Sequence, residues 1–179
     1  MRKRPLTQNN GGSDDEKLYE NDKDIVAQCQ LWVARSYAEL GWLYEAEEAL
    51  SKVNIDNLKR KNQPFYSAVA GDIMLKQARY KDALPFVKIA RESENRKGYR
   101  ARFEYILGQL YQYNHQNAAA KEAYKRVTHL NPDPDLNFNA NLHYAEMLGD
   151  TVKSVKQLQK LAKLKKNEDK QDQIFGMIG

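Results

Sequence analysis

Apolar residues recur along this chain at the spacing of one face of an α-helix. The first such face, from about Asp24 onward, consists of Ile25, Leu31, Val33, Ala34, Tyr37 and Leu40. Residues three and four positions apart share one side of a helix, so this period indicates helices that bury a single stripe. The pattern predicts helices at residues 24–40, 43–55, 64–78, 80–93, 99–113, 116–130, 136–148 and 150–165. We therefore expect an all-α fold.

Small residues recur at a fixed step within these helices. Ala34, Gly71 and Gly108 are 37 residues apart, and the same step separates Ala46, Ala83 and Ala120. Antiparallel helices approach closely only where the facing side chains are small. We predict that each small residue meets the alanine of its own helix pair, with Gly108 against Ala120.

This spacing resembles that of the tetratricopeptide repeat family. The third unit carries it best, with Leu107-Gly108, Tyr111, Ala120, Tyr124 and Pro132. A fourth unit is weaker because Leu142 and Ser154 stand where small residues are expected. The resemblance implies a tetratricopeptide-like right-handed superhelix of about four antiparallel helix pairs.

We predict three segments along the chain. Residues 1–16 are expected to form a disordered arm, because they offer little apolar surface to bury. Residues 17–166 are expected to form the repeat domain, with units at about 24–62, 63–98, 99–133 and 134–166. Residues 167–179 look like the start of a further helix. Because a polar capping helix is missing, we expect a fragment of a longer array.

A closer resemblance rests on several short segments, at residues 31–35, 39–41, 44–47, 102–111, 130–132, 138–140, 166–167 and 172–175. Together they are similar to the helical array in large outer-membrane lipoproteins of bacterial gliding motility and type IX secretion, over about residues 25–176. The resemblance implies a protein on the periplasmic side of the outer membrane, held there by a lipid anchor that this chain lacks. If the chain is complete, a cytoplasmic location is the alternative.

The composition narrows the classes of function. The net charge of +5 and the pI near 9.1 permit an acidic partner, but are modest for a dedicated nucleic-acid binder. The single cysteine, Cys29, excludes an internal disulfide and a multi-cysteine metal site. No apolar run reaches the roughly 18–20 residues that a membrane span needs.

No constellation of catalytic or metal-binding residues stands out. The three histidines are not spaced to share a helical face, which argues against a zinc site. Asp133, Asp135 and Asn137 imitate the start of a calcium loop, but Phe138 and Tyr144 stand where its glycine and closing carboxylate belong. We expect no enzyme activity, no cofactor, no metal and no small-molecule substrate.

The family resemblance also suggests where a partner binds, because the first helix of each pair lines a concave groove in that family. Carried over slot by slot, it gives three rows: Leu31, Ala68, Tyr105 and Asn139; Arg35, Asp72, Gln109 and His143; and Glu39, Lys76, Tyr113 and Met147. This mixture of charges, amides and aromatic rings suits an extended or helical protein segment. The alternative is that Arg35 pairs with Asp72 and the groove binds nothing.

The leading hypothesis is a protein–protein interaction scaffold of the tetratricopeptide type, as part of a cell-envelope assembly. The alternative is a basic helical-repeat module that binds RNA, suggested by the pI and by the lysines at 153, 156, 160 and 163. These lysines fall at helical spacing, and a solvated outer face explains them better than a binding surface does. Nucleic acid is therefore the less favoured partner.

Overall fold

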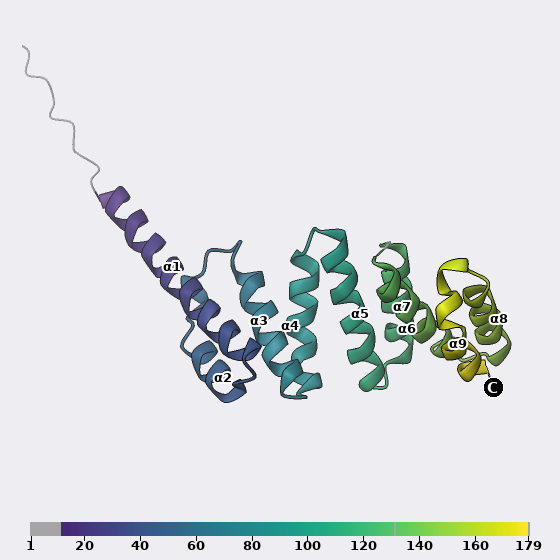
Figure 1. The fold of residues 1–179 in the computed structure, drawn as a ribbon. Coiled ribbons are helices and arrows are strands. Elements are labelled where there is room, and N and C mark those ends of the chain that lie inside the picture. Colours follow the sequence, from purple (N-terminus) through teal and green to yellow (C-terminus); the bar gives the residue numbers. More distant parts are fainter. Residues whose placement is uncertain (1–11, 131, 179) are drawn as a thin grey trace, which may run out of the picture. The chain divides into compact units, whose positions relative to one another are not determined.

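The computed structural model describes residues 12–130 and 132–178, and within these ranges the chain is entirely helices and connecting loops (Figure 1). The helices are α1 (Gly12–Glu39), α2 (Leu43–Ser51), α3 (Gln63–Lys76), α4 (Tyr80–Ser93), α5 (Lys97–Tyr113), α6 (Asn117–His129), α7 (Pro134–Glu146), α8 (Thr151–Ala162) and α9 (Gln171–Ile178), with short 3-10 segments η1 (Ile55–Asn57) and η2 (Lys165–Lys170). The predicted all-α class is confirmed.

The eight predicted helices correspond to α1 to α8, with ends that mostly differ by a few residues. The main difference is at the start, where α1 begins at Gly12 and not near Asp24. Residues 12–16, which the sequence analysis assigns to the arm, are therefore helical, and residues 1–11 lie outside the described part. Once a helix is nucleated, each added residue gains a backbone hydrogen bond, so α1 extends beyond its apolar stripe.

The chain divides into two compact units, up to Val69 and from Ala70 onward, which are described separately. In the first unit α1 packs against α2 and η1. Its buried Asp24 accepts hydrogen bonds from the Lys59 backbone N–H at 2.8 Å and from the Asn62 amide at 3.0 Å. The Lys59 N–H holds the pKa of Asp24 below its ordinary value. This carboxylate thus ties the loop before α3 to α1.

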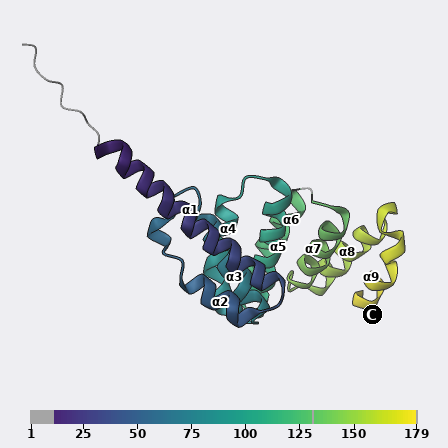
Figure 2. The same cartoon turned by 60° about the vertical axis from the view of Figure 1, so that its left-hand side comes forward.

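In the second unit each helix from α4 to α9 packs against the next one along the chain. Figures 1 and 2 both show α5, α6 and α7 as close neighbours, and α5 also contacts α7 directly. The core between α4 and α5 contains Ala83, Val87, Leu107 and Leu110. Further along, Phe138 joins α8 and α9 residues in another buried cluster. The first helices α5 and α7 of two successive pairs therefore touch, with α6 between them in the chain.

A left-handed backbone conformation recurs in the turns between paired helices. Gly41, Ala78, His115 and Gly149 have φ values of +79°, +58°, +57° and +67°. At the first three turns, the N–H of the following residue donates to the carbonyl oxygen five positions earlier, at 2.8–2.9 Å. A left-handed residue followed by this hydrogen bond is a common way for a helix to end, and glycine is the residue most often found at the left-handed position. The turn repeats at steps of 37, 37 and 34 residues, so the sequence repeat is also a backbone repeat.

The small residues of the repeat meet larger partners than predicted. A Cβ atom added to Gly108 would lie 2.5 Å from the ring of Tyr124, and one added to Gly71 would lie 3.2 Å from Val87. The nearest side chain to Gly108 is therefore Tyr124, which comes one turn later on α6 than the predicted Ala120. Gly108 leaves room for Tyr124, whose side chain is fully buried.

We predict that His115→Gly stabilises the protein. A residue with a Cβ atom destabilises the folded state by about 1–2 kcal/mol when its backbone is in the left-handed region. Glycine adds roughly 0.5–1 kcal/mol of chain entropy to the unfolded state. The exposed His115 has little packing to lose, so we expect a net gain of about 0.5–1 kcal/mol in the free energy of unfolding. Urea denaturation measures it. The matched control, Gly41→Ala, introduces the same strain and should destabilise; equal stability of His115→Gly and wild type would contradict the analysis.

We predict that Gly108→Ala destabilises the protein by about 1–3 kcal/mol, because its methyl group overpacks the immobile Tyr124 ring. Gly98 provides the control, since a Cβ there meets nothing within 4 Å. Gly98→Ala should leave the thermal midpoint unchanged or raise it. If Gly108→Ala and Gly98→Ala melt alike, the helix crossing described here is incorrect. Combining Gly108→Ala with Tyr124→Leu should cost less than the sum of the two changes.

Candidate partner-binding surface

The twelve residues predicted to line a groove fall into both units. Leu31, Arg35, Glu39 and Ala68 belong to the first, and Asp72, Lys76, Tyr105, Gln109, Tyr113, Asn139, His143 and Met147 belong to the second. The second set contains two places where predicted residues come together.

In the first unit, Leu31 is fully buried and cannot touch a partner, so its assignment to the groove is wrong. The physical reason is its position on α1, where it shares one stripe with the buried Ala27, Ala34 and Ala38. Arg35 is exposed and lies over the ring of Trp32 at 5.2 Å. Ala68 is half-buried.

The charged members of the rows form ion pairs along their own helices. Arg35 lies 4.0 Å from Glu39 on α1, and Lys76 lies 2.9 Å from Asp72 on α3. Both pairs are four residues apart and largely solvated, an arrangement that contributes a few tenths of a kcal/mol each.

The rings of Tyr105, Tyr124 and His143 form a cluster where α5, α6 and α7 meet. The Tyr124 ring is stacked on His143 at 5.0 Å and lies edge-on to Tyr105 at 5.7 Å. The Tyr124 hydroxyl donates to Oε1 of Gln112 at 2.9 Å, and Nδ1 of His143 lies 2.9 Å from Glu146 Oε2. Tyr124 fixes the two predicted groove residues in place.

Burial raises the pKa values of both tyrosines in this cluster. For Tyr124 the pKa rises well above its ordinary value, chiefly because the hydroxyl is desolvated and secondarily because of Tyr105 and Glu146. For Tyr105 desolvation again dominates, with a contribution from Glu146. Both hydroxyls are therefore neutral hydrogen-bonding groups at physiological pH. These two hydroxyls therefore position neighbouring side chains.

A hollow of about 390 Å³ opens beside the same face of α5, lined by Leu75, Tyr80, Ile106, Gln109, Leu110 and Tyr113. The rings of Tyr80 and Tyr113 meet edge-on with their centroids 4.6 Å apart. Tyr113 is 57% exposed, whereas Leu110 is buried beneath it. The hollow thus has an apolar floor, an aromatic wall and one amide, Gln109, at its edge.

Two of the six residues that line this hollow, Gln109 and Tyr113, were predicted from the sequence. The other four were missed because the slot-by-slot comparison covered only one position per turn on first helices. Tyr80 begins a second helix and could have been found from its place, since it follows the left-handed turn at Ala78 by two residues. Two further predicted residues of this unit lie outside the hollow. Asn139 is exposed on α7, and Met147, directly after α7, is half-buried.

A polar rim borders the hollow. Arg79 lies 3.0 Å from Asp82, and these two residues line a smaller depression of about 270 Å³ with Tyr80, Lys81 and Tyr113.

A larger hollow of about 420 Å³ lies along α1 and α2 in the first unit, around Cys29 and Val33. None of the twelve predicted residues lines it.

Within the described part of the chain, His, Cys, Asp and Glu side chains do not gather in threes or more in an arrangement that could hold a metal ion. Nor does any described helix combine the length and the apolar character needed to cross a membrane.

Comparison with known proteins adds no relative. No protein-family model matches the sequence, and no curated protein matches it either. The resemblances to tetratricopeptide repeats and to envelope lipoproteins therefore rest on the residues themselves. What the site can do has to be argued from its geometry.

Proposed function

We propose that this chain is a protein-interaction scaffold of the tetratricopeptide type, and that the hollow on α5 receives an apolar side chain of a partner protein. The observation that carries this proposal is the hollow itself, where a 57% exposed tyrosine stands over a floor of Leu75, Ile106 and Leu110. Exposed aromatic rings beside apolar pockets are the usual anchors of protein interfaces.

The size and lining of the hollow suit a side chain better than a metabolite. Its volume of about 390 Å³ lies near the lower end of the range for small-molecule sites, about 300–1,000 Å³. Its polar groups are the Gln109 amide and the hydroxyls of Tyr80 and Tyr113, and no charged side chain lines it. The Arg79–Asp82 pair at the border can hydrogen-bond the main chain or flanking residues of a bound segment.

The backbone repeat supports the tetratricopeptide assignment. The left-handed turn recurs at the steps of the sequence repeat, and α5 contacts α7, the first helix of the next pair. Such stacking places successive first helices in one row, as repeat arrays do. In that arrangement a bound segment crosses α5 and α7 and meets the ring of His143 as well as Tyr113.

We predict that Tyr113→Ala removes recognition of peptides with a bulky apolar anchor. The probe is a phage-displayed random peptide library selected on the purified chain. Sequences enriched on the wild type should contain a leucine, phenylalanine or tryptophan anchor, and Tyr113→Ala should weaken their binding by about 1–3 kcal/mol. Isothermal titration with synthetic peptides measures the loss, and circular dichroism checks that helicity is retained.

Tyr44→Ala is the matched control, because it removes a tyrosine that is 77% exposed on α2, outside the hollow. It should leave peptide binding unchanged. The proposal is refuted if selection enriches no peptide family, or if Tyr44→Ala and Tyr113→Ala have equal effects. An enriched family that Tyr113→Ala leaves intact would place the binding site elsewhere.

The resemblance to gliding-motility and type IX secretion lipoproteins leads to a finer proposal about location. We infer that this protein is a component of a bacterial envelope assembly and lies on the periplasmic side of the outer membrane. Fractionation of cells that produce the tagged protein tests this proposal. We expect the tag with the outer membrane, and recovery in the cytosol would favour the cytoplasmic alternative.

A further inference from the structure

Several helices of the second unit carry an excess of positive charge. Counting lysine and arginine against aspartate and glutamate, α4 has three against two, α5 three against one, α6 three against one and α8 three against none, whereas α7 has none against two. The consecutive helices α4, α5 and α6 thus carry nine basic residues against four acidic ones. Such an excess produces a field that attracts acidic groups.

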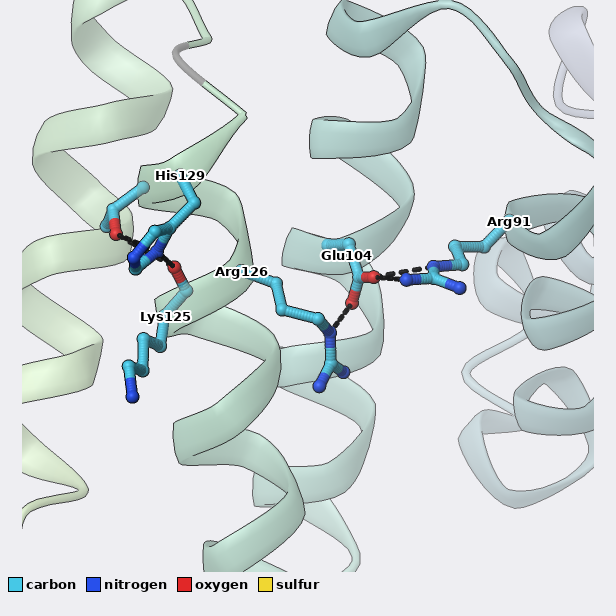
Figure 3. A network of polar contacts seen from close by, with 6 residues as sticks. Arg91, Glu104, Lys125, Arg126 and His129 are labelled. Carbon is cyan, nitrogen blue, oxygen red and sulfur yellow. Dashed lines mark hydrogen bonds and ion pairs between the residues drawn. The ribbon is translucent and has the colours of Figure 1, made fainter.

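A buried carboxylate organises the centre of this charge. Glu104 on α5 is 0% exposed and is held by two arginines, one from α4 and one from α6 (Figure 3). Arg91 Nε donates to Glu104 Oε1 at 2.5 Å, and Arg126 Nε donates to Oε2 at 2.9 Å. The two guanidiniums therefore converge on one carboxylate from different helices and leave one uncompensated positive charge.

These guanidiniums have donors to spare. The Arg126 side chain is 45% exposed, and its two terminal nitrogens have no partner among the described residues. The Arg91 side chain is 26% exposed and binds Glu104 through Nε and one terminal nitrogen. A guanidinium carries five N–H donors in a planar fork that matches a carboxylate. Glu104 fixes both forks in advance, so an incoming acid meets donors that have already lost their freedom.

We propose that Arg91 and Arg126 form a docking site for the carboxylates of an acidic protein segment, separate from the hollow on α5. Lys88 is exposed and lies one turn before Arg91 on α4, with its Nζ 5.3 Å from the centre of the Tyr111 ring, and it extends this site along α4. Lys125 directly precedes Arg126 on α6, and its side chain is directed away from Glu104 (Figure 3).

The surroundings favour an acidic protein over single-stranded RNA. RNA-binding surfaces interleave basic residues with exposed aromatic rings, on which the bases stack. Among the described residues of α4, α6 and α8, the exposed aromatic ring is the imidazole of His129, whose Nδ1 lies 2.7 Å from the Lys125 carbonyl oxygen. Tyr80 and Phe86 are half-buried, and Tyr124 is fully buried. This surface therefore offers charge and planar donors, with a single exposed imidazole that is already held by its own helix.

The test is fluorescence anisotropy with a labelled peptide of alternating glutamate and serine, at low salt. Its glutamine counterpart and an oligouridylate of equal charge serve as comparison probes. We expect the wild type to bind the glutamate peptide more tightly than either. Arg126→Gln should weaken that binding by about tenfold, the loss of one charge-assisted pair. Arg126→Lys should also weaken it, since it keeps the charge but not the fork.

Arg60→Gln is the matched control, because it removes an exposed arginine from the loop before α3. It should leave the affinity unchanged. Equal losses for Arg60→Gln and Arg126→Gln, or tighter binding of the oligouridylate, would overturn the proposal. If Arg126→Gln unfolds, the comparison passes to Arg126→Lys and Arg91→Lys, which keep a cation beside Glu104 but remove a planar fork. Tyr113→Ala should not affect this binding, so failure here is distinguishable from failure of the hollow.

Discussion

The contact between Gly108 and the Tyr124 ring is the constraint on which the candidate surface depends. Without a side chain at Gly108, α5 and α6 approach closely enough to bury the largest fully enclosed side chain among the described residues. The Tyr124 ring then contacts Tyr105 and His143, which are predicted groove residues. A core contact thus determines where the surface residues stand. The same contact holds Tyr105 against Tyr124, so Tyr105 is half-buried. Tyr113, two turns further along α5, is more accessible than Tyr105.

Glu104 lies one turn before Gly108 on α5 and restrains the same helix in a second way. Gly108 sets how closely α5 and α6 approach, whereas Glu104 sets the rotation of α5. Turning the helix would withdraw the carboxylate from Arg91 or Arg126 and leave a buried charge without its partners. Removing one partner of such a pair costs about 3–5 kcal/mol, so the alternative registers are strongly disfavoured. Apolar packing and a buried ion pair therefore specify one arrangement together.

The sequence predicted the helices well, because apolar residues recur at helical spacing and turn residues separate most of the segments. Gly41 and Gly149 mark two of those turns, but Ala78 and His115 adopt the same left-handed conformation without the residue that would reveal it. The site was predicted only in part. Leu31 was assigned to the groove although its stripe is buried, since family slots do not show which way a helix is rotated. Tyr80 was missed because its contact with Tyr113 joins residues from different pairs.

Two kinds of recognition chemistry are separated on and around α5. Glu104 and Gln109 are five residues apart, which is about 140° around the helix, so they face different neighbours. The proposed hollow beside Gln109 selects by shape, because a floor of aliphatic side chains accepts only an apolar anchor. The proposed arginine site selects by charge, and charge acts over longer distances and speeds encounter more than it strengthens the final complex. A partner with an acidic stretch near an apolar anchor would use the basic helices to approach and the hollow to stay bound. Salt should therefore slow the association of such a partner more than it speeds its release.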